Sequence, residues 1–115
     1  MYVQVDLGTT PPTVSLEEPD DCKRFHLTVV NGREAAMVFG ALVDAAAGRL
    51  EDGHAWVTVD AVRRMAAGRV GPGWDADFEA MLGFAATKGW LDPNRASIQA
   101  HVEWTAGDPV AGHWA

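Results

Sequence analysis

The chain has little of what marks a secreted, membrane or metal-cluster protein. Cys22 is its only cysteine, so neither an intramolecular disulfide nor a cluster of thiolate metal ligands can form. The N-terminus shows no basic region followed by an apolar core, and no run approaches the roughly 18 apolar residues of a membrane span. We therefore expect a soluble, cytoplasmic protein with no membrane contact, no metal site and no cofactor.

Positive charge is also scarce. Nine lysines and arginines face 16 aspartates and glutamates, which gives a net charge of −7. Residues 1–22 carry five acids and no base. Affinity for nucleic acid depends on neutralising phosphates, so this balance makes a nucleic-acid partner unfavourable and helps to keep the protein in solution.

Catalytic motifs are missing from the sequence as well. Residues 68–73 are rich in glycine, but they lack the Gly-Lys-Ser/Thr ending of a P-loop and follow no predicted strand. Neither Ser15 nor Ser97 has the context of an activated nucleophile. Cys22, between Asp21 and Lys23, has no neighbour that would clearly activate its thiol. The sequence gives no positive reason to expect an enzyme.

A chain of 115 residues, 48% of them hydrophobic, is long enough to fold as one domain with its own core. Alternating apolar residues predict strands at residues 2–7 and 24–30, and we expect these two strands to pair like a hairpin. Residues 8–21 between them read as a long acidic loop with a short extended patch at residues 14–16. Residues 105–115 read as a tail.

An apolar helix is predicted at residues 35–47, after a capping arrangement of Asn31 and Glu34. This segment is apolar nearly all round, so it must be buried on more than one side. In so small a domain, one side can face a second copy of the chain. We therefore predict a homodimer with Val38 and Leu42 at its interface.

The clearest helix is predicted at residues 75–88, with Asp75 as N-cap and Gly89 as a left-handed stop. Its apolar residues recur with the spacing of one buried stripe, Phe78, Met81, Leu82 and Ala85. Residues 56–59 predict a short strand, and residues 60–67 predict a helix with Asp60 at its start. The expected fold class is α+β, and a ferredoxin-like layer of sheet and helix is the alternative.

From Asn31 onward the predicted order is helix, short strand, helix, glycine-rich turn, helix, short strand, turn and strand. This order resembles the winged helix-turn-helix superfamily over residues 31–104. The resemblance implies that residues 60–67 are the second helix, residues 75–88 the recognition helix and residues 90–104 the wing.

The charge of that recognition helix departs from the pattern of the superfamily. Recognition helices normally offer Arg, Lys, Asn or Gln to DNA, whereas this one begins with Asp75, Asp77 and Glu79. The residues left for contacts to phosphate are four arginines, Arg63, Arg64, Arg69 and Arg95. A DNA-binding regulator therefore stays only as an alternative.

The best cluster of polar residues lies on the last strand, predicted at residues 96–104. Gln99, His101 and Glu103 point to the same side because side chains two apart share one face of a strand. His101 and Glu103 could share a proton, or ligate a metal if a third ligand were supplied. His26 would join them if its strand lay alongside.

Two interpretations of that face are open. It can be a solvated strand face, or it can be the site of a small enzyme or ligand-binding protein, with Trp56 and Gln99 as walls of a pocket. Our leading interpretation of the chain is a noncatalytic interaction or regulatory domain, homodimeric and able to bind a protein partner.

The acidic start of the helix at residues 75–88 predicts negligible binding to duplex DNA at physiological salt. We expect an affinity weaker than the roughly 10⁻⁴ to 10⁻⁶ M of ordinary nonspecific binders, because these carboxylates repel phosphate. A gel-shift assay with competitor DNA measures this. Sequence-specific binding in that assay would contradict the prediction.

Overall fold

The computed structural model describes residues 1–94 and 96–105, and it confirms the α+β class. The elements in chain order are β1 (Tyr2–Asp6), β2 (Thr13–Glu17), β3 (His26–Val30), α1 (Ala35–Asp44), β4 (Gly48–Glu51), β5 (His54–Thr58), α2 (Val59–Ala66), α3 (Trp74–Thr87) and β6 (Ser97–Trp104).

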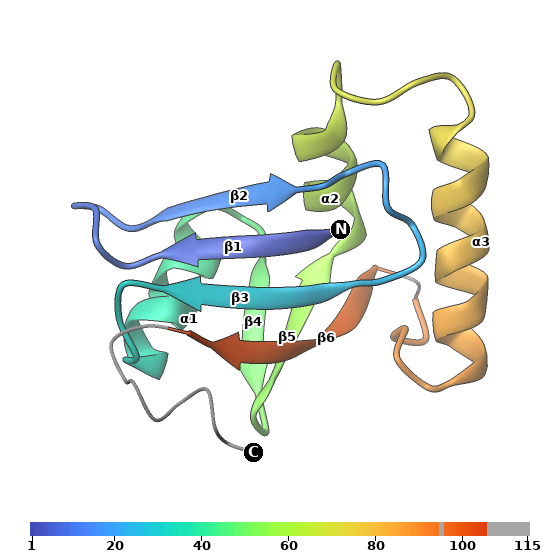
Figure 1. Ribbon diagram of the computed structural model, residues 1–115. Coiled ribbons are helices and arrows are strands. Elements are labelled where there is room, and N and C mark those ends of the chain that lie inside the picture. The colour runs from blue at the N-terminus through green and yellow to red at the C-terminus, as the bar shows by residue number, and fades with distance from the viewer. Residues whose placement is uncertain (95, 106–115) are drawn as a thin grey trace.

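All six strands belong to one sheet in the order β2-β1-β3-β6-β5-β4. β1 pairs antiparallel with β2 and parallel with β3, and β3 pairs parallel with β6. β6, β5 and β4 then follow in antiparallel order. In Figure 1, β1 to β3 cross the view sideways whereas β4 and β5 run up and down, so the sheet curls at β6.

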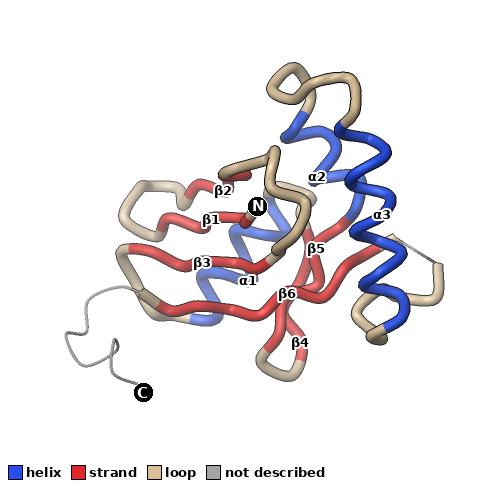
Figure 2. Tube along the Cα trace, turned by 45° about the vertical axis from the view of Figure 1, so that its right-hand side comes forward, coloured by secondary structure: helices blue, strands red, loops and turns tan. Residues whose placement is uncertain are grey.

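Helices α1 and α2 lie on one side of this curled sheet, and the core forms between them and the strands (Figure 1). The opposite side of the sheet carries the polar residues of the strands. α3 stands beside α2 in Figures 1 and 2. Arg63 of α2 binds Asp75 of α3, with Nη1 to Oδ1 at 3.1 Å, and it also binds Glu79. Trp74 of α3 donates its ring N–H to the Pro19 carbonyl at 2.7 Å.

The predicted stripe of α3 is confirmed, because Phe78, Met81, Leu82 and Ala85 are all buried. Gly89 has a φ of +77°, as expected for a residue that ends a helix. The alternation of β6 is confirmed at residues 98–103, but not at its ends, where Ser97 is buried and Trp104 is only half-buried. Ile98, Ala100 and Val102 are buried, whereas His101 and Glu103 are exposed. β6 lies in the middle of the sheet, between β3 and β5, and a bridge between Leu91 and Ile98 precedes it.

The expected pairing of the first strand with residues 24–30 is confirmed, but the two strands are parallel and do not form a hairpin. The hairpin partner of β1 is β2, which the sequence indicated only as an extended patch within a loop. Leu16 of β2 is buried, so this segment packs into the core as well as pairing with β1. The chain then returns past β1, so β3 lies parallel to it.

A second hairpin occupies residues 48–58, where the sequence predicted only a short strand at residues 56–59. β4 pairs with β5 through a turn at Asp52 and Gly53, whose φ angles are +53° and +81°. Positive φ at both central residues is typical of the type I′ turn that suits a two-residue hairpin, and Asp-Gly is a favoured sequence for it. This dipeptide was the signal that could have predicted the hairpin.

The predicted starts of all three helices differ from the structure. Asn31 does not cap α1; it has a φ of +60° and donates its amide N–H to Asp6 at 2.9 Å. α2 is capped by Thr58, whose hydroxyl oxygen accepts the Ala61 N–H at 3.1 Å, rather than by Asp60. α3 begins one residue before Asp75.

Phe78 and Phe84 of α3 offer a matched test of this packing, because they are 0% and 57% exposed. We expect Phe78→Ala to lower the free energy of unfolding by about 3–5 kcal/mol, through lost burial and a new cavity. Phe84→Ala should change it by less than about 1 kcal/mol. Urea unfolding of both variants measures the difference. Equal losses would show that α3 does not pack with this face inward.

Candidate functional site

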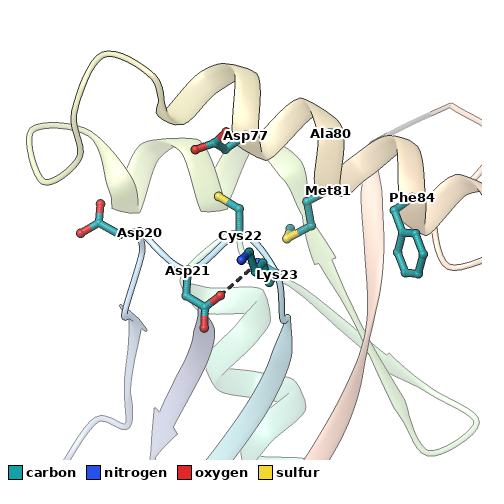
Figure 3. Close-up of a pocket in the computed structure, with 8 residues that line it drawn as sticks. All are labelled: Asp20, Asp21, Cys22, Lys23, Asp77, Ala80, Met81 and Phe84. Atoms are coloured by element: carbon teal, nitrogen blue, oxygen red, sulfur yellow. Dashed lines mark hydrogen bonds between the residues drawn. The ribbon is translucent and has the colours of Figure 1, made fainter.

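A groove with a volume of about 660 Å³ lies between the loop at residues 20–23 and α3. Figure 3 shows the loop on one side of the groove and the helix on the other. Its lining residues are Asp20, Asp21, Cys22, Lys23, Asp77, Ala80, Met81 and Phe84. The sequence did not predict this groove, because its two walls lie more than fifty residues apart in the chain.

The loop that forms one wall is tied down at both ends. The Met1 amino group donates to the Asp21 carbonyl at 2.6 Å and to the Arg24 carbonyl at 3.0 Å. On the other side, Trp74 of α3 holds Pro19 through the ring N–H bond described above. The Met1 bonds therefore hold the loop beside the start of β1, and the Trp74 bond joins the chain just before the loop directly to α3.

Apolar and acidic residues occupy different parts of the groove. Ala80, Met81 and Phe84 of α3 supply its apolar surface. Asp20, Asp21 and Asp77 supply three carboxylates, and the single ammonium group among the lining residues is that of Lys23. Figure 3 shows the acidic residues toward one end and Phe84 at the other.

The local hydrogen bonds and charges shift the pKa values of two lining residues. The Lys23 backbone N–H donates to the Asp21 carboxylate at 3.0 Å, and this bond lowers the pKa of Asp21, which is ionised at neutral pH. Burial raises the pKa of the Cys22 thiol, and the charge of Asp77 raises it further. Cys22 is therefore a protonated thiol at neutral pH, which is a poor nucleophile.

The site residues predicted from the sequence lie elsewhere, on the open side of the sheet. The structure places His26 and His101 at paired positions on the adjacent strands β3 and β6. His26 Nε2 lies 3.6 Å from Glu103 Oε1. His26, His101 and Glu103, which the sequence predicted to meet if their strands lay side by side, are thus neighbours. The contact between His26 and Glu103 lies in a solvated setting, with the two side chains 27% and 50% exposed, and even charged pairs in such a setting contribute little to stability.

Two further residues extend this group into a row across four strands, which we call the histidine row: Tyr2, His26, His101 and His54. His54 is paired with His101 across β5 and β6, and Tyr2 is paired with His26 across β1 and β3. The Tyr2 and His26 rings stack with centroids 5.0 Å apart. The alternation of their strands predicted that His26 and His101 face outward, whereas His54 lay outside the strand predicted at residues 56–59, and the pairing of the strands was needed to align the row.

A second cavity, of about 250 Å³, opens at one end of the histidine row. Its lining residues are Phe25, His54, Trp90, Gln99 and His101. Gln99, one of the expected pocket walls, does line it. Trp56, the other, lies at the position paired with Gln99 and is covered by the guanidinium of Arg49, 5.4 Å from its ring centroid.

Among residues 1–94 and 96–105, no group of three or more His, Cys, Asp or Glu side chains is arranged to hold a metal ion. In the same residues, no helix is both long and apolar enough to cross a membrane. Val38 and Leu42, predicted at a dimer interface, lie in the core of the chain and are 0% exposed.

Comparison with protein-family models, curated proteins and solved structures finds no match to this chain. Its function must therefore be argued from its own surfaces and cavities.

The effect of Asp77 on Cys22 leads to a direct prediction. Asp77→Asn removes a negative charge near the thiol, so the Cys22 pKa should fall and its thiolate fraction at pH 8 should rise. We expect alkylation by iodoacetamide to be about two- to threefold faster than in the unchanged protein. Glu51→Gln, which removes a charge on β4, is the control and should leave the rate unchanged. Equal rates for the two variants would contradict the electrostatic coupling.

Proposed function

We propose that this chain is a noncatalytic interaction domain that acts as a homodimer through the outer face of α1. The observation that carries the proposal is the exposure of two large apolar side chains that share one side of this helix, Phe39 and Val43, which are 44% and 53% exposed. Met37, 41% exposed, lies on the other flank of the buried face. Exposed apolar side chains gathered on one element mark surfaces that bind another protein.

The inner and outer faces of α1 have different roles in this proposal. Val38 and Leu42 bind the helix to its own core, so they cannot touch a second copy while the fold is intact. Phe39 and Val43 are one turn apart on the outward side. The predicted interface therefore moves from the buried pair to the exposed residues of the same helix, and the helix is buried on two sides in the dimer.

Charge and shape both favour a second copy as the partner of this face. α1 carries no charged residue before Asp44, its last residue. The electrostatic repulsion between two copies, each with a net charge of −7, is therefore weak at this face. A Cβ built on Gly40 meets nothing within 4 Å, so the surface between Phe39 and Val43 is open to an approaching helix. A two-fold contact would place this patch against itself.

The contacts of the arginines count against the alternative of a DNA-binding regulator. Arg63 is bound by two carboxylates of α3. Arg64 donates to the Ala45 carbonyl at 3.0 Å, and Arg69 donates to the Leu16 carbonyl at 2.8 Å. The fourth candidate, Arg95, lies outside the described residues. We keep the winged-helix resemblance of residues 31–104 as a proposal about fold alone.

A small enzyme or ligand-binding protein is the second candidate function. It is favoured by the contact between His26 and Glu103 and by the cavity that His101 shares with His54. Imidazole and amide groups between the aromatic residues Phe25 and Trp90 suit a small polar ligand. None of the residues that line this cavity is a serine or cysteine nucleophile, so binding is the better supported of the two activities.

The dimer is tested by placing a charge on the outer face of α1. Phe39→Glu and Val43→Glu should each weaken dimerisation by more than about tenfold, because both copies would bury an unpaired carboxylate. Circular dichroism should show that both variants stay folded, since neither side chain is in the core. Analytical ultracentrifugation measures the association.

Ala86→Glu is the matched control, because it adds the same charge at an exposed position of α3 and should leave the dimer intact. An unchanged protein that remains monomeric at high micromolar concentration would overturn the proposal. So would a Val43→Glu variant that dimerises as strongly as the unchanged protein.

A further inference from the structure

We propose that the groove between residues 20–23 and α3 is a docking site for a short cationic segment of another protein. The segment would carry an apolar side chain next to lysine or arginine. This proposal concerns a different surface from the outer face of α1 and does not depend on dimerisation. It is argued below from the apolar surface, the charge and the surroundings of the groove.

The apolar end of the groove is held in place although it is exposed. Phe84 is 57% exposed, yet Trp90 packs against it edge to face with ring centroids 6.1 Å apart. The ammonium group of Lys88 lies 5.5 Å from the centroid of the Phe84 ring. Beside Phe84, Met81 is 8% exposed and anchored in the core. An aromatic side chain fixed in advance loses little conformational entropy when a ligand covers it.

The acidic end has the charge to hold a cation. Asp21 is ionised at neutral pH, and the bond from the Lys23 N–H lowers the pKa of its carboxyl below the ordinary value. Within the residues that the structure describes, the carboxylates of Asp20 and Asp77 have no ion-pair partner, and both residues are exposed. Three carboxylates against one lysine leave this end negative, so an arginine or lysine is the complementary group.

The separation of the acidic end from the apolar end determines which residues a bound segment must carry, and how far apart. Figure 3 places the carboxylates toward one end and Phe84 at the other, with Cys22 and Met81 between them. A volume of about 660 Å³ is within the usual range for sites that hold a small ligand or a few side chains. The matching segment therefore has a basic residue and an apolar residue close together.

A second copy of this chain is a poor occupant. It carries the same net charge of −7, and three of its arginines are already bound inside the fold. The chain's own C-terminal residues are equally unsuitable, because residues 106–115 contain no lysine or arginine. They also follow Thr105, whose N–H donates to the Val29 carbonyl at the far end of β3 from the groove loop.

The experiment uses the whole chain and a fluorescein-labelled peptide in which a central tryptophan is flanked by arginines in a glycine-serine background. Fluorescence anisotropy should show saturable binding that weakens as salt is added. Bound peptide should also protect Cys22, the only thiol, from alkylation, because this residue lines the groove. Two control peptides replace the arginines by glutamates or the tryptophan by serine, and both should bind much more weakly.

Protein variants locate the bound peptide. The double variant Asp20→Asn and Asp77→Asn should weaken binding by about fivefold, as expected for two exposed charge pairs. The double variant Glu51→Gln and Asp52→Asn removes the same charge at the β4–β5 turn and should not affect binding. Phe84→Ala should weaken binding by about tenfold, whereas Phe39→Ala, at a similarly exposed phenylalanine of α1, should not.

Several results would overturn the proposal. One is the absence of saturable binding up to about 1 mM peptide. Another is equal binding by the two double variants, which would mean that net charge alone attracts the peptide. Protection of Cys22 that rises with protein concentration when no peptide is present would identify a second copy as the occupant. The α1 variants report on the dimer separately, so failure of either proposal can be recognised.

Discussion

Backbone hydrogen bonds on both sides of β6 hold the two parts of the sheet together. β6 pairs with β3 of the β2-β1-β3 part of the sheet and with β5 of the β5-β4 part, so one strand late in the chain joins the two parts. Its inward side chains Ile98, Ala100 and Val102 are buried in the core. Every feature that depends on the alignment of the two parts, including the histidine row, follows from this pairing.

The second constraint is the way in which charges are distributed. Arginines that would otherwise offset the negative charge are used inside the fold, where Arg63 joins α2 to α3 and Arg69 joins α2 to β2. Carboxylates of the groove stay open to solvent instead. A chain with excess negative charge thus concentrates three carboxylates beside one apolar surface, and this combination distinguishes the groove from an ordinary solvated loop.

The two proposed interaction surfaces have opposite chemistry. The outer face of α1 is apolar and nearly free of charge, which suits self-association of an acidic protein. The groove is acidic at one end and apolar at the other, which suits a basic partner. A domain that used both surfaces would bind its partner as a dimer and present two grooves, and linked grooves would increase the avidity for a partner with repeated basic segments.

Local patterns in the sequence determined the elements whose evidence lies within a few neighbouring residues. The spacing of Phe78, Met81, Leu82 and Ala85 predicted the buried stripe of α3, and the alternation along residues 98–103 of β6 predicted which of its side chains face outward. Both predictions succeeded because the period of an element decides which residues share a face. The period says nothing of what covers that face.

Contacts between distant segments were decided only by the tertiary structure. The apolar pattern of α1 predicted burial on two sides, but packing against the core decided that Val38 and Leu42 face inward while Phe39 and Val43 face out. Likewise, the outward position of His101 was predicted, whereas its neighbour His54 was known only once β5 lay against β6. The groove depends on a loop and a helix that meet across the fold. Such contacts depend on the packing of the whole chain, and the local periodicity of a sequence does not report which distant segments will meet.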